Sequence, residues 1–342
     1  MIRFKFITAA FASLITLAVD DVRAERASSL INPAAVDHIR AIQAAIFDEN
    51  WYDAECLADE FERAEPNSPT HHILRAAAIQ AESFSDEEKS AERRFKTQIE
   101  LAGALLDKRL ESCSRADSAV AYFFMGHCHS LGAIWASKYG SFISALRLGL
   151  KARNRYSKGL KLDSGFIDLH TGLGTYRYWK SVKAGILKWT GIFKNEKDTG
   201  IAQVRLAAER SLFSRDAAKS LLIWILINEK NYSEAADLSR ELCQTYPHGK
   251  TFLWPLAECY SKMKLYPLAI DTYLDLRARL LPDPGNHINL IRVDFEISRL
   301  AEKIDDRATI RLIAAGFDEY YRDTPLSTQR LLHGKYFALG RL

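Results

Sequence analysis

Several features are scarce or missing from this 342-residue chain. Only nine prolines occur, and 48% of the residues are hydrophobic against 26% charged, which excludes a disordered protein. Runs of alternating β-branched residues between turn signals are hard to find, which argues against a sheet. The five cysteines include no CxxC pair, so a redox or zinc motif of that kind is absent.

The familiar catalytic motifs are also missing. The chain contains no G-x-S-x-G, no H-E-x-x-H and no G-x-x-x-x-G-K-[ST]. The acids Asp163, Asp168 and Glu196 form an acid-base pair only if the fold brings them together. The sequence therefore predicts a protein without catalytic activity or cofactor, and a cryptic cell-envelope enzyme is an alternative.

Two histidine groups resemble metal ligands at first sight. His127, Cys128 and His129 offer donors that suit zinc or copper. Residues two apart on a helix project about 200° from each other, and adjacent residues such as His71 and His72 diverge by about 100°. Helical geometry thus favours core or surface histidines and predicts no metal site.

The N-terminus has the features of a secretory signal. Arg3 and Lys5 precede an apolar run from Phe6 to Val19, and Val22-Arg23-Ala24 resembles a cleavage site. At about 1.5 Å per residue the run covers roughly 21 Å, too little for a bilayer core about 30 Å thick. Residue 25 is glutamate, so the cysteine of a lipoprotein is absent. We expect residues 1–24 to be removed, and the mature chain to be soluble and exported, in the periplasm or cell envelope.

From residue 33 onward, helical periodicity dominates and recurs with a 34-residue step. Ala235 and Ala269 are 34 residues apart, and proline follows Ala54 and Ala235 at the same distance of twelve residues. This pattern resembles the tetratricopeptide repeat, a helix-turn-helix unit with W-x2-L-G-x2-Y, A-x3-F and P. The positions that carry the match are Leu253, Leu256, Ala257, Tyr260, Ala269 and Tyr273.

The resemblance also explains the stretch Gly172-Leu173-Gly174-Thr175-Tyr176-Arg177-Tyr178-Trp179. Leu173 and Gly174 fall on the leucine-glycine place of a first helix. A dinucleotide-binding loop needs a preceding strand and a third glycine, and neither is present. The glycines are therefore predicted to permit close helix packing.

The resemblance implies an all-α fold, a right-handed α-solenoid of helix hairpins with some helices elongated, forming one domain over 25–342. The clearest repeats span about 216–282, an insertion lies at 180–199, and capping helices occupy about 286–342. The predicted hairpins are 34–65, 69–111, 116–162, 166–212, 215–246, 250–281 and 286–322, with a last helix from about Ser327. The tyrosine-rich segment and the longer helices resemble divergent exported bacterial tetratricopeptide proteins, and this implies a scaffold that binds a protein or peptide.

Positive charge is concentrated in the middle of the chain. Residues 138–197 hold 13 bases and three acids, whereas the chain without residues 1–24 has a net charge of only +3. Such a concentration can steer an anionic partner, or it can be a solvated helix face. Nucleic acid would fit basic residues interleaved with aromatics, but export argues against it.

The partner-binding residues predicted from this region are Tyr176, Arg177, Trp179, Lys183, Lys188 and Trp189. The first three lie on a helix that would face the concave side of the solenoid. The others belong to an amphipathic insertion in which Val182, Ile186, Trp189 and Phe193 share one helical face. That element would contact either the solenoid itself or an anionic membrane surface.

The cysteines leave two alternatives open. An oxidising compartment permits disulfides, and Cys243 and Cys259 fall on neighbouring helices of the predicted repeat. A bond between them requires Cα atoms within about 7 Å. Two buried free thiols are the other alternative.

Overall fold

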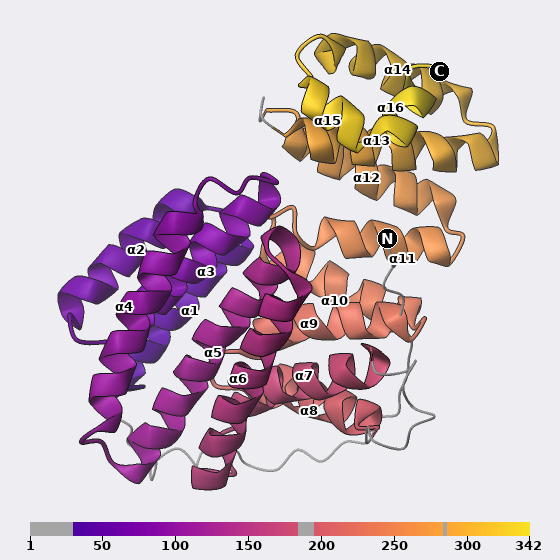
Figure 1. Cartoon of the computed structure of the whole chain (residues 1–342). Coiled ribbons are helices and arrows are strands. Elements are labelled where there is room, and N and C mark those ends of the chain that lie inside the picture. The colour runs from indigo at the N-terminus through magenta and orange to yellow at the C-terminus, as the bar shows by residue number, and fades with distance from the viewer. Residues whose placement is uncertain (1–29, 184–194, 283–285) are drawn as a thin grey trace. The chain divides into compact units, whose positions relative to one another are not determined.

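The computed structural model describes residues 30–183, 195–282 and 286–342. These residues form sixteen α-helices and one 3-10 helix, which confirms the predicted all-α class. Figure 1 shows the helices following one another as antiparallel neighbours within each part of the chain. In chain order the helices are α1 (Pro33–Phe47), α2 (Trp51–Ala64), α3 (Thr70–Ser85), α4 (Glu92–Leu110), α5 (Arg115–Tyr139), α6 (Phe142–Leu162), α7 (Leu169–Lys183), α8 (Lys197–Arg210), α9 (Arg215–Asn228), α10 (Tyr232–Thr245), α11 (Leu253–Lys262), α12 (Tyr266–Leu280), α13 (His287–Ala301), η2 (Glu302–Ile304), α14 (Arg307–Tyr321), α15 (Leu326–Leu331) and α16 (His333–Leu339).

Each predicted hairpin range contains two α-helices, and the range 286–322 also contains η2. The predicted hairpin 34–65 is α1 and α2, and the predicted hairpin 116–162 is α5 and α6, with 25 and 21 residues. The elongated helices are thus confirmed. The helix expected from Ser327 is instead two short helices, α15 and α16, because the backbone of Leu332 (φ −112°, ψ 23°) departs from helical geometry between them.

The insertion predicted at 180–199 is shorter than expected. α7 continues to Lys183, and α8 already begins at Lys197. Residues 184–194 lie outside the described residues, and so does most of the predicted amphipathic element.

Side-chain caps set many of the helix starts. A side-chain oxygen before the helix accepts the backbone N–H of a residue in the first turn, which supplies one donor that the helix leaves unpaired. The residues that cap in this way are Asn32, Asn50, Ser114, Ser141, Asn231 and Asp306. These polar residues mark the boundaries that helical periodicity alone leaves uncertain.

The repeat spacing is visible in the packing. α10 and α12 begin 34 residues apart, and Ala235 and Ala269 occupy the same place in them with no exposed surface. α10 packs on α11, α11 on α12 and α12 on α13. These four helices therefore pack against their neighbours in chain order, as helical repeats do.

Close packing accounts for the glycines of the tyrosine-rich stretch. A Cβ on Gly174 would lie 2.8 Å from the carbonyl oxygen of Gly200, because α7 and α8 approach backbone to backbone. A Cβ on Gly172 would enter the ring of Tyr156. Both glycines lie inside α7, so the interpretation as packing glycines is confirmed.

The described residues fall into two compact units. We call residues 30–82, 89–183 and 195–225 the first unit, and residues 83–88, 226–282 and 286–342 the second unit. The single domain inferred from the repeat pattern stays a prediction. Among the described residues, no helix combines the length and the apolar character that crossing a bilayer requires.

The second unit has a buried ionic centre. Arg277 on α12 donates from Nε to Asp294 Oδ1 on α13 at 2.6 Å. The hydroxyl of Tyr320 on α14 donates to the other carboxylate oxygen at 2.8 Å. Asp294 has no exposed surface, so these hydrogen bonds satisfy a charge that has no access to water.

Candidate functional site

The N-terminal half of α6 lacks buried residues. From Phe142 to Lys151 no position is buried, and the buried residues of the helix are Ala152, Tyr156 and Gly159 farther along. Ser141 caps its start by accepting from the N–H of Ser144 at 3.1 Å. This part of the helix is therefore capped at its start and contacts α5 through Leu148 beside Gly132, while its other side is exposed.

Four large apolar side chains lie on this open part. Phe142 is 66% exposed, Ile143 68%, Leu146 50% and Leu150 37%. Positions 142, 146 and 150 are four residues apart, so they follow one side of the helix. We call these four residues the apolar stripe.

A second stripe on the same helix is positively charged. α6 carries six basic residues and no acidic residue. Arg147, Lys151, Arg155 and Lys158 recur at intervals of four, four and three, and we call them the basic stripe. Arg147 and Lys151 each follow a residue of the apolar stripe by one position, or about 100° around the helix, so the two stripes run side by side.

The cations of α6 have aromatic neighbours and no acidic partners. None of the six bases of α6 forms an ion pair with a described residue, and Arg147 and Lys151 are exposed. The guanidinium of Arg155 lies 5.9 Å, and the ammonium of Lys158 5.5 Å, from the ring centre of Tyr122. Cation–π contacts of this kind hold the side chains in place without neutralising them.

The residues predicted on α7 lie mostly in contacts within the fold. Arg177 donates from Nη1 to Gln203 Oε1 at 2.7 Å and pairs with Glu196 at 3.5 Å, so it joins α7 to the start of α8. Tyr176 lies 5.6 Å from the guanidinium of Arg153, and the Trp179 ring packs edge-on against Tyr178 at 5.1 Å. All three predicted side chains are half-buried.

Of the other predicted binding residues, only Lys183 belongs to the described part of the chain. The Lys183 ammonium lies 5.7 Å from the ring centre of Phe142, at the edge of the apolar stripe. Lys188 and Trp189 lie outside the described residues. Sequence analysis missed the apolar stripe itself, although the i, i+4, i+8 spacing of 142, 146 and 150 was readable.

The acids proposed for an acid-base pair have structural partners. Asp168 is buried and accepts the backbone N–H groups of Leu212, Phe213 and Ser214 at 2.9 to 3.1 Å. Glu196 pairs with Arg177 and Lys180. Their contacts account for both carboxylates as anchors of the α7–α8 region.

The His127-Cys128-His129 group is not gathered around a common point. Among the described residues, the groups of three or more donors close enough for a metal do not include it. Burial lowers the pKa of His127 to about 4 and raises the pKa of the Cys128 thiol to about 12. His127 stacks on Phe123 at 6.1 Å, as a core residue does.

All five cysteines are free thiols in the structure. Cys243 and Cys259 therefore do not form the disulfide that the repeat positions permitted. Burial raises the pKa of Cys243 to about 11 and of Cys259 to about 12, so both are protonated at neutral pH.

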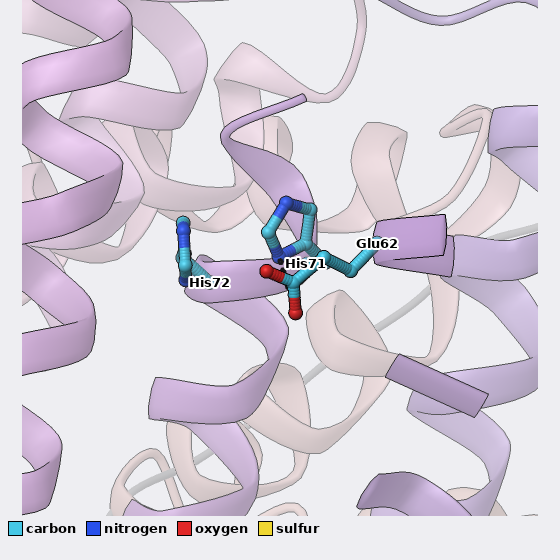
Figure 2. Close-up of side chains that lie close together, drawn as sticks. All are labelled: Glu62, His71 and His72. Atoms are coloured by element: carbon cyan, nitrogen blue, oxygen red, sulfur yellow. Dashed lines mark ion pairs between the residues drawn. The ribbon is translucent and has the colours of Figure 1, made fainter. Parts of the chain in front are cut away.

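The geometric argument against His71 and His72 is wrong. Their ring centres lie 4.2 Å apart at the start of α3. One donor atom each of Glu62, His71 and His72 lies within 4.8 Å of the others (Figure 2). A divergence of about 100° at the backbone does not keep two long side chains in the first turn of a helix from meeting.

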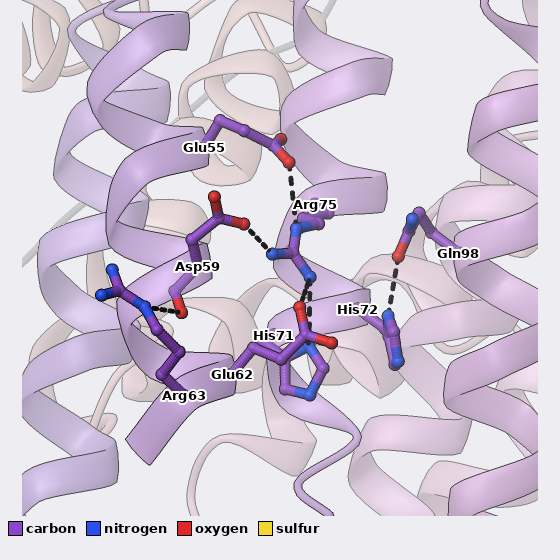
Figure 3. A network of polar contacts seen from close by, with 8 residues as sticks. All are labelled: Glu55, Asp59, Glu62, Arg63, His71, His72, Arg75 and Gln98. Carbon is purple, nitrogen blue, oxygen red and sulfur yellow. Dashed lines mark hydrogen bonds and ion pairs between the residues drawn. The ribbon is translucent and has the colours of Figure 1, made fainter. Parts of the chain in front are cut away.

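A wider polar network surrounds these three residues (Figure 3). Arg75 on α3 donates to Glu55 at 3.1 Å, to Glu62 at 2.6 Å and to Asp59, all on one face of α2. Its side chain is only 8% exposed, and it is the cation that faces these three acids. Burial lowers the pKa of His71 to about 4, so its imidazole is neutral at neutral pH.

No protein-family model and no curated protein sequence matches this chain. Among solved structures, it is similar to the C-terminal part of a TPR repeat-containing protein from Cytophaga hutchinsonii, with 14% identity and a TM-score of 0.43, over 86% of this chain and 99% of that one. It is also similar to aspartyl phosphate phosphatase F from Bacillus subtilis, with 14% identity and a TM-score of 0.39, over 87% of this chain and 77% of that one.

Proposed function

We propose that this protein is a non-catalytic helical scaffold that binds another protein through α6. The observation that supports the proposal is the pairing of the apolar stripe with the basic stripe on a helix that has no acidic residue. Exposed apolar side chains beside unpaired cations form a surface that a partner can cover with gain from both.

The chemistry of the two stripes defines the partner. Phe142 and Leu146 require apolar side chains of the partner opposite them. Arg147 and Lys151 require carboxylates on the face of the partner that adjoins those apolar side chains. An amphipathic helix with leucines on one face and glutamates on the adjoining face presents that pattern. We therefore propose an acidic amphipathic segment of a partner protein as the occupant.

The test uses a labelled synthetic peptide of that pattern and the full chain. Fluorescence anisotropy should show binding that weakens as salt rises, because the exposed charges are screened. The double variant Arg147→Glu/Lys151→Glu should weaken binding about tenfold or more at low salt, and Leu146→Ser/Leu150→Ser should do so at every salt concentration.

Matched controls distinguish a loss of binding specific to α6 from a general effect of changed charge or hydrophobicity. Arg311→Glu/Arg322→Glu reverses two exposed charges elsewhere, and Leu265→Ser/Leu268→Ser removes two apolar side chains of comparable exposure, 43% and 48%. Both controls should bind as the unmodified chain does. Equal losses in the controls, or no loss in the α6 variants, would show that α6 is not the binding surface.

A membrane surface is the alternative occupant, since Lys183 beside Phe142 adds positive charge at the edge of the apolar stripe. Vesicles of anionic phosphatidylglycerol decide between the two. If the protein sediments with these vesicles through Leu146 and Leu150 and ignores the acidic peptide, α6 is a membrane-binding element and the protein partner is excluded.

We also infer that the chain is exported, which the basic start, the short apolar run and Val22-Arg23-Ala24 support. Intact-mass analysis of the protein recovered from its native host should find a chain that begins at Glu25. A stable species that keeps residues 1–24 would contradict this.

A further inference from the structure

We propose that Glu62, His71 and His72 bind one divalent transition-metal ion, with Zn²⁺ as the ion that fits best. The three side chains come from the end of α2 and the start of α3, and their donor atoms lie within 4.8 Å of one another. Two imidazole nitrogens and one carboxylate oxygen are a donor set that zinc accepts, with a fourth position left for water.

The hydrogen bonds of the two histidines determine which ring nitrogens can bind a metal. Nδ1 of His72 lies 2.7 Å from Oε1 of Gln98, an acceptor, so Nδ1 carries the proton and Nε2 has the lone pair. Arg75 donates from Nη1 to Nδ1 of His71 at 3.3 Å, so the lone pair of this nitrogen, which lies 4.0 Å from Glu62, is directed at the guanidinium. His72 thus has a free lone pair, and His71 offers one to a metal only when Arg75 moves away from Nδ1.

Gln98 matches the usual partner of a metal-binding histidine. Such histidines donate their second ring nitrogen to a carbonyl or carboxylate, which fixes the tautomer and the ring orientation. Here the amide carbonyl of Gln98 on α4 has that role for His72. A histidine in contact with water does not need a protein acceptor of this kind.

Three carboxylates, of Glu55, Asp59 and Glu62, pair with the guanidinium of Arg75, and Arg93 and Arg94 line the cavity beside Glu55. Arg75 and a metal would compete for Glu62. Because Arg75 also bonds Glu55 and Asp59, it can release Glu62 and remain paired.

A cavity of about 260 Å³ reaches Arg75 and Gln98, the residues that contact His71 and His72, but its lining includes Arg93 and Arg94 and none of the three donors. Glu62 is 43% exposed, whereas the His71 side chain is fully buried. The ion would enter from the side of Glu62 and His72 and reach His71 last.

The experiment is metal binding by the full chain after treatment with a chelator. Calorimetric titration with Zn²⁺ should show one equivalent bound, and Co²⁺ should give visible d–d absorption that Zn²⁺ abolishes. Glu62→Gln and His72→Gln should each weaken Zn²⁺ binding about 100-fold, and Gln98→Leu about tenfold, since it acts only through His72. Circular dichroism should show that these variants of partly exposed residues keep the helical fold.

Glu55→Gln is the matched control, because it removes the same charge from the same network without touching the three donors. Its affinity should stay within about threefold of the unmodified chain. Three results would overturn the proposal: no stoichiometric Zn²⁺ binding by the unmodified chain, unchanged binding in Glu62→Gln and His72→Gln, or an equal loss in Glu55→Gln, which would indicate only a diffuse acidic surface.

Discussion

Gly174 shows, at the residue scale, how one methyl group can decide the packing of two helices. A Cβ there meets the carbonyl oxygen of Gly200 at 2.8 Å and the side chain of Val204 at 2.9 Å. A backbone oxygen cannot rotate away, so α7 and α8 would have to separate. Gly174→Ala should therefore lower the free energy of unfolding by about 1–3 kcal/mol, measured by urea denaturation.

Gly103 on α4 is the control for that substitution, since a Cβ added there meets no atom within 4 Å. Gly103→Ala should raise the free energy of unfolding by up to about 1 kcal/mol, because alanine is the better helix former. If both substitutions stabilise the protein, α7 and α8 do not approach as closely as the structure indicates.

His127 gives a residue-scale prediction about pH. Burial lowers its pKa from 6.5 to about 4, so the folded protein binds fewer protons here than the unfolded chain does. The contribution to stability is complete above pH 6.5 and is lost as the pH falls from 6.5 toward 4, by about 3 kcal/mol at most.

His127→Phe should remove that part of the acid sensitivity, because phenylalanine can keep the stack on Phe123. The measurement is the urea midpoint at several pH values between 7 and 4.5. His333→Gln, which replaces an exposed histidine, is the control substitution. An identical slope in His127→Phe and the unmodified chain would contradict the prediction.

At the scale of the helices, most boundaries could be predicted from the sequence because they depend on neighbours along the chain. Asn50 and Asn231 cap α2 and α10, and the alanines 34 residues apart mark where helices cross. The break at Leu332 was missed because no proline stands at or next to this position. A distortion there depends on packing rather than on a local signal.

The two candidate sites show why their residues were predicted less completely from the sequence than the helices were. Basic residues of α6 were recognised, but the apolar stripe was not, because periodicity cannot tell which face of an amphipathic helix lacks a neighbour. The His71–His72 pair was dismissed on backbone angles alone, and Glu62 was not considered with it. The i, i+4, i+7 spacing of Glu55, Asp59 and Glu62 places three acids on one face of α2 and is readable in the sequence. The turn between α2 and α3 brings Arg75 opposite this face.

The ionic centre that joins three helices of the second unit gives a prediction at this scale. Arg277→Met should destabilise the unit by about 3–5 kcal/mol, because it leaves the buried Asp294 carboxylate without its cation. The double variant Arg277→Met/Asp294→Asn removes the charge as well and should cost less than the single one. Urea denaturation of these two variants and of Asp294→Asn completes the cycle, and a loss in the double variant equal to the sum of the two single losses would show that the pair is not coupled.

At the scale of the whole molecule, some contacts join residues that are far apart in the chain. Within the second unit, Asn286 and Asn289 both donate to the backbone carbonyl of Ser85, at 3.1 and 2.7 Å. Arg292 pairs with Glu87 at 2.5 Å. More than 200 residues separate these partners, so no local pattern could predict that segment 83–88 belongs with α13.

These contacts between distant parts of the chain differ from the packing between adjacent repeats that a helical repeat protein requires. They predict that a change on α13 loosens a segment near the N-terminal end of the chain. Asn286→Ala/Asn289→Ala leaves the Ser85 carbonyl without two donors and should cost about 1–3 kcal/mol. Hydrogen exchange followed by mass spectrometry should then show faster exchange of the amides in residues 83–88.

Arg299→Gln supplies the control on the same helix, because Arg299 pairs only with Glu296 within α13. It removes a helical ion pair worth a few tenths of a kcal/mol and should leave exchange in residues 83–88 unchanged. If the double asparagine variant also leaves that exchange unchanged, the two hydrogen bonds do not hold the segment. Only contacts between hairpins that are adjacent in the chain would then stabilise the unit, as in a simple repeat array.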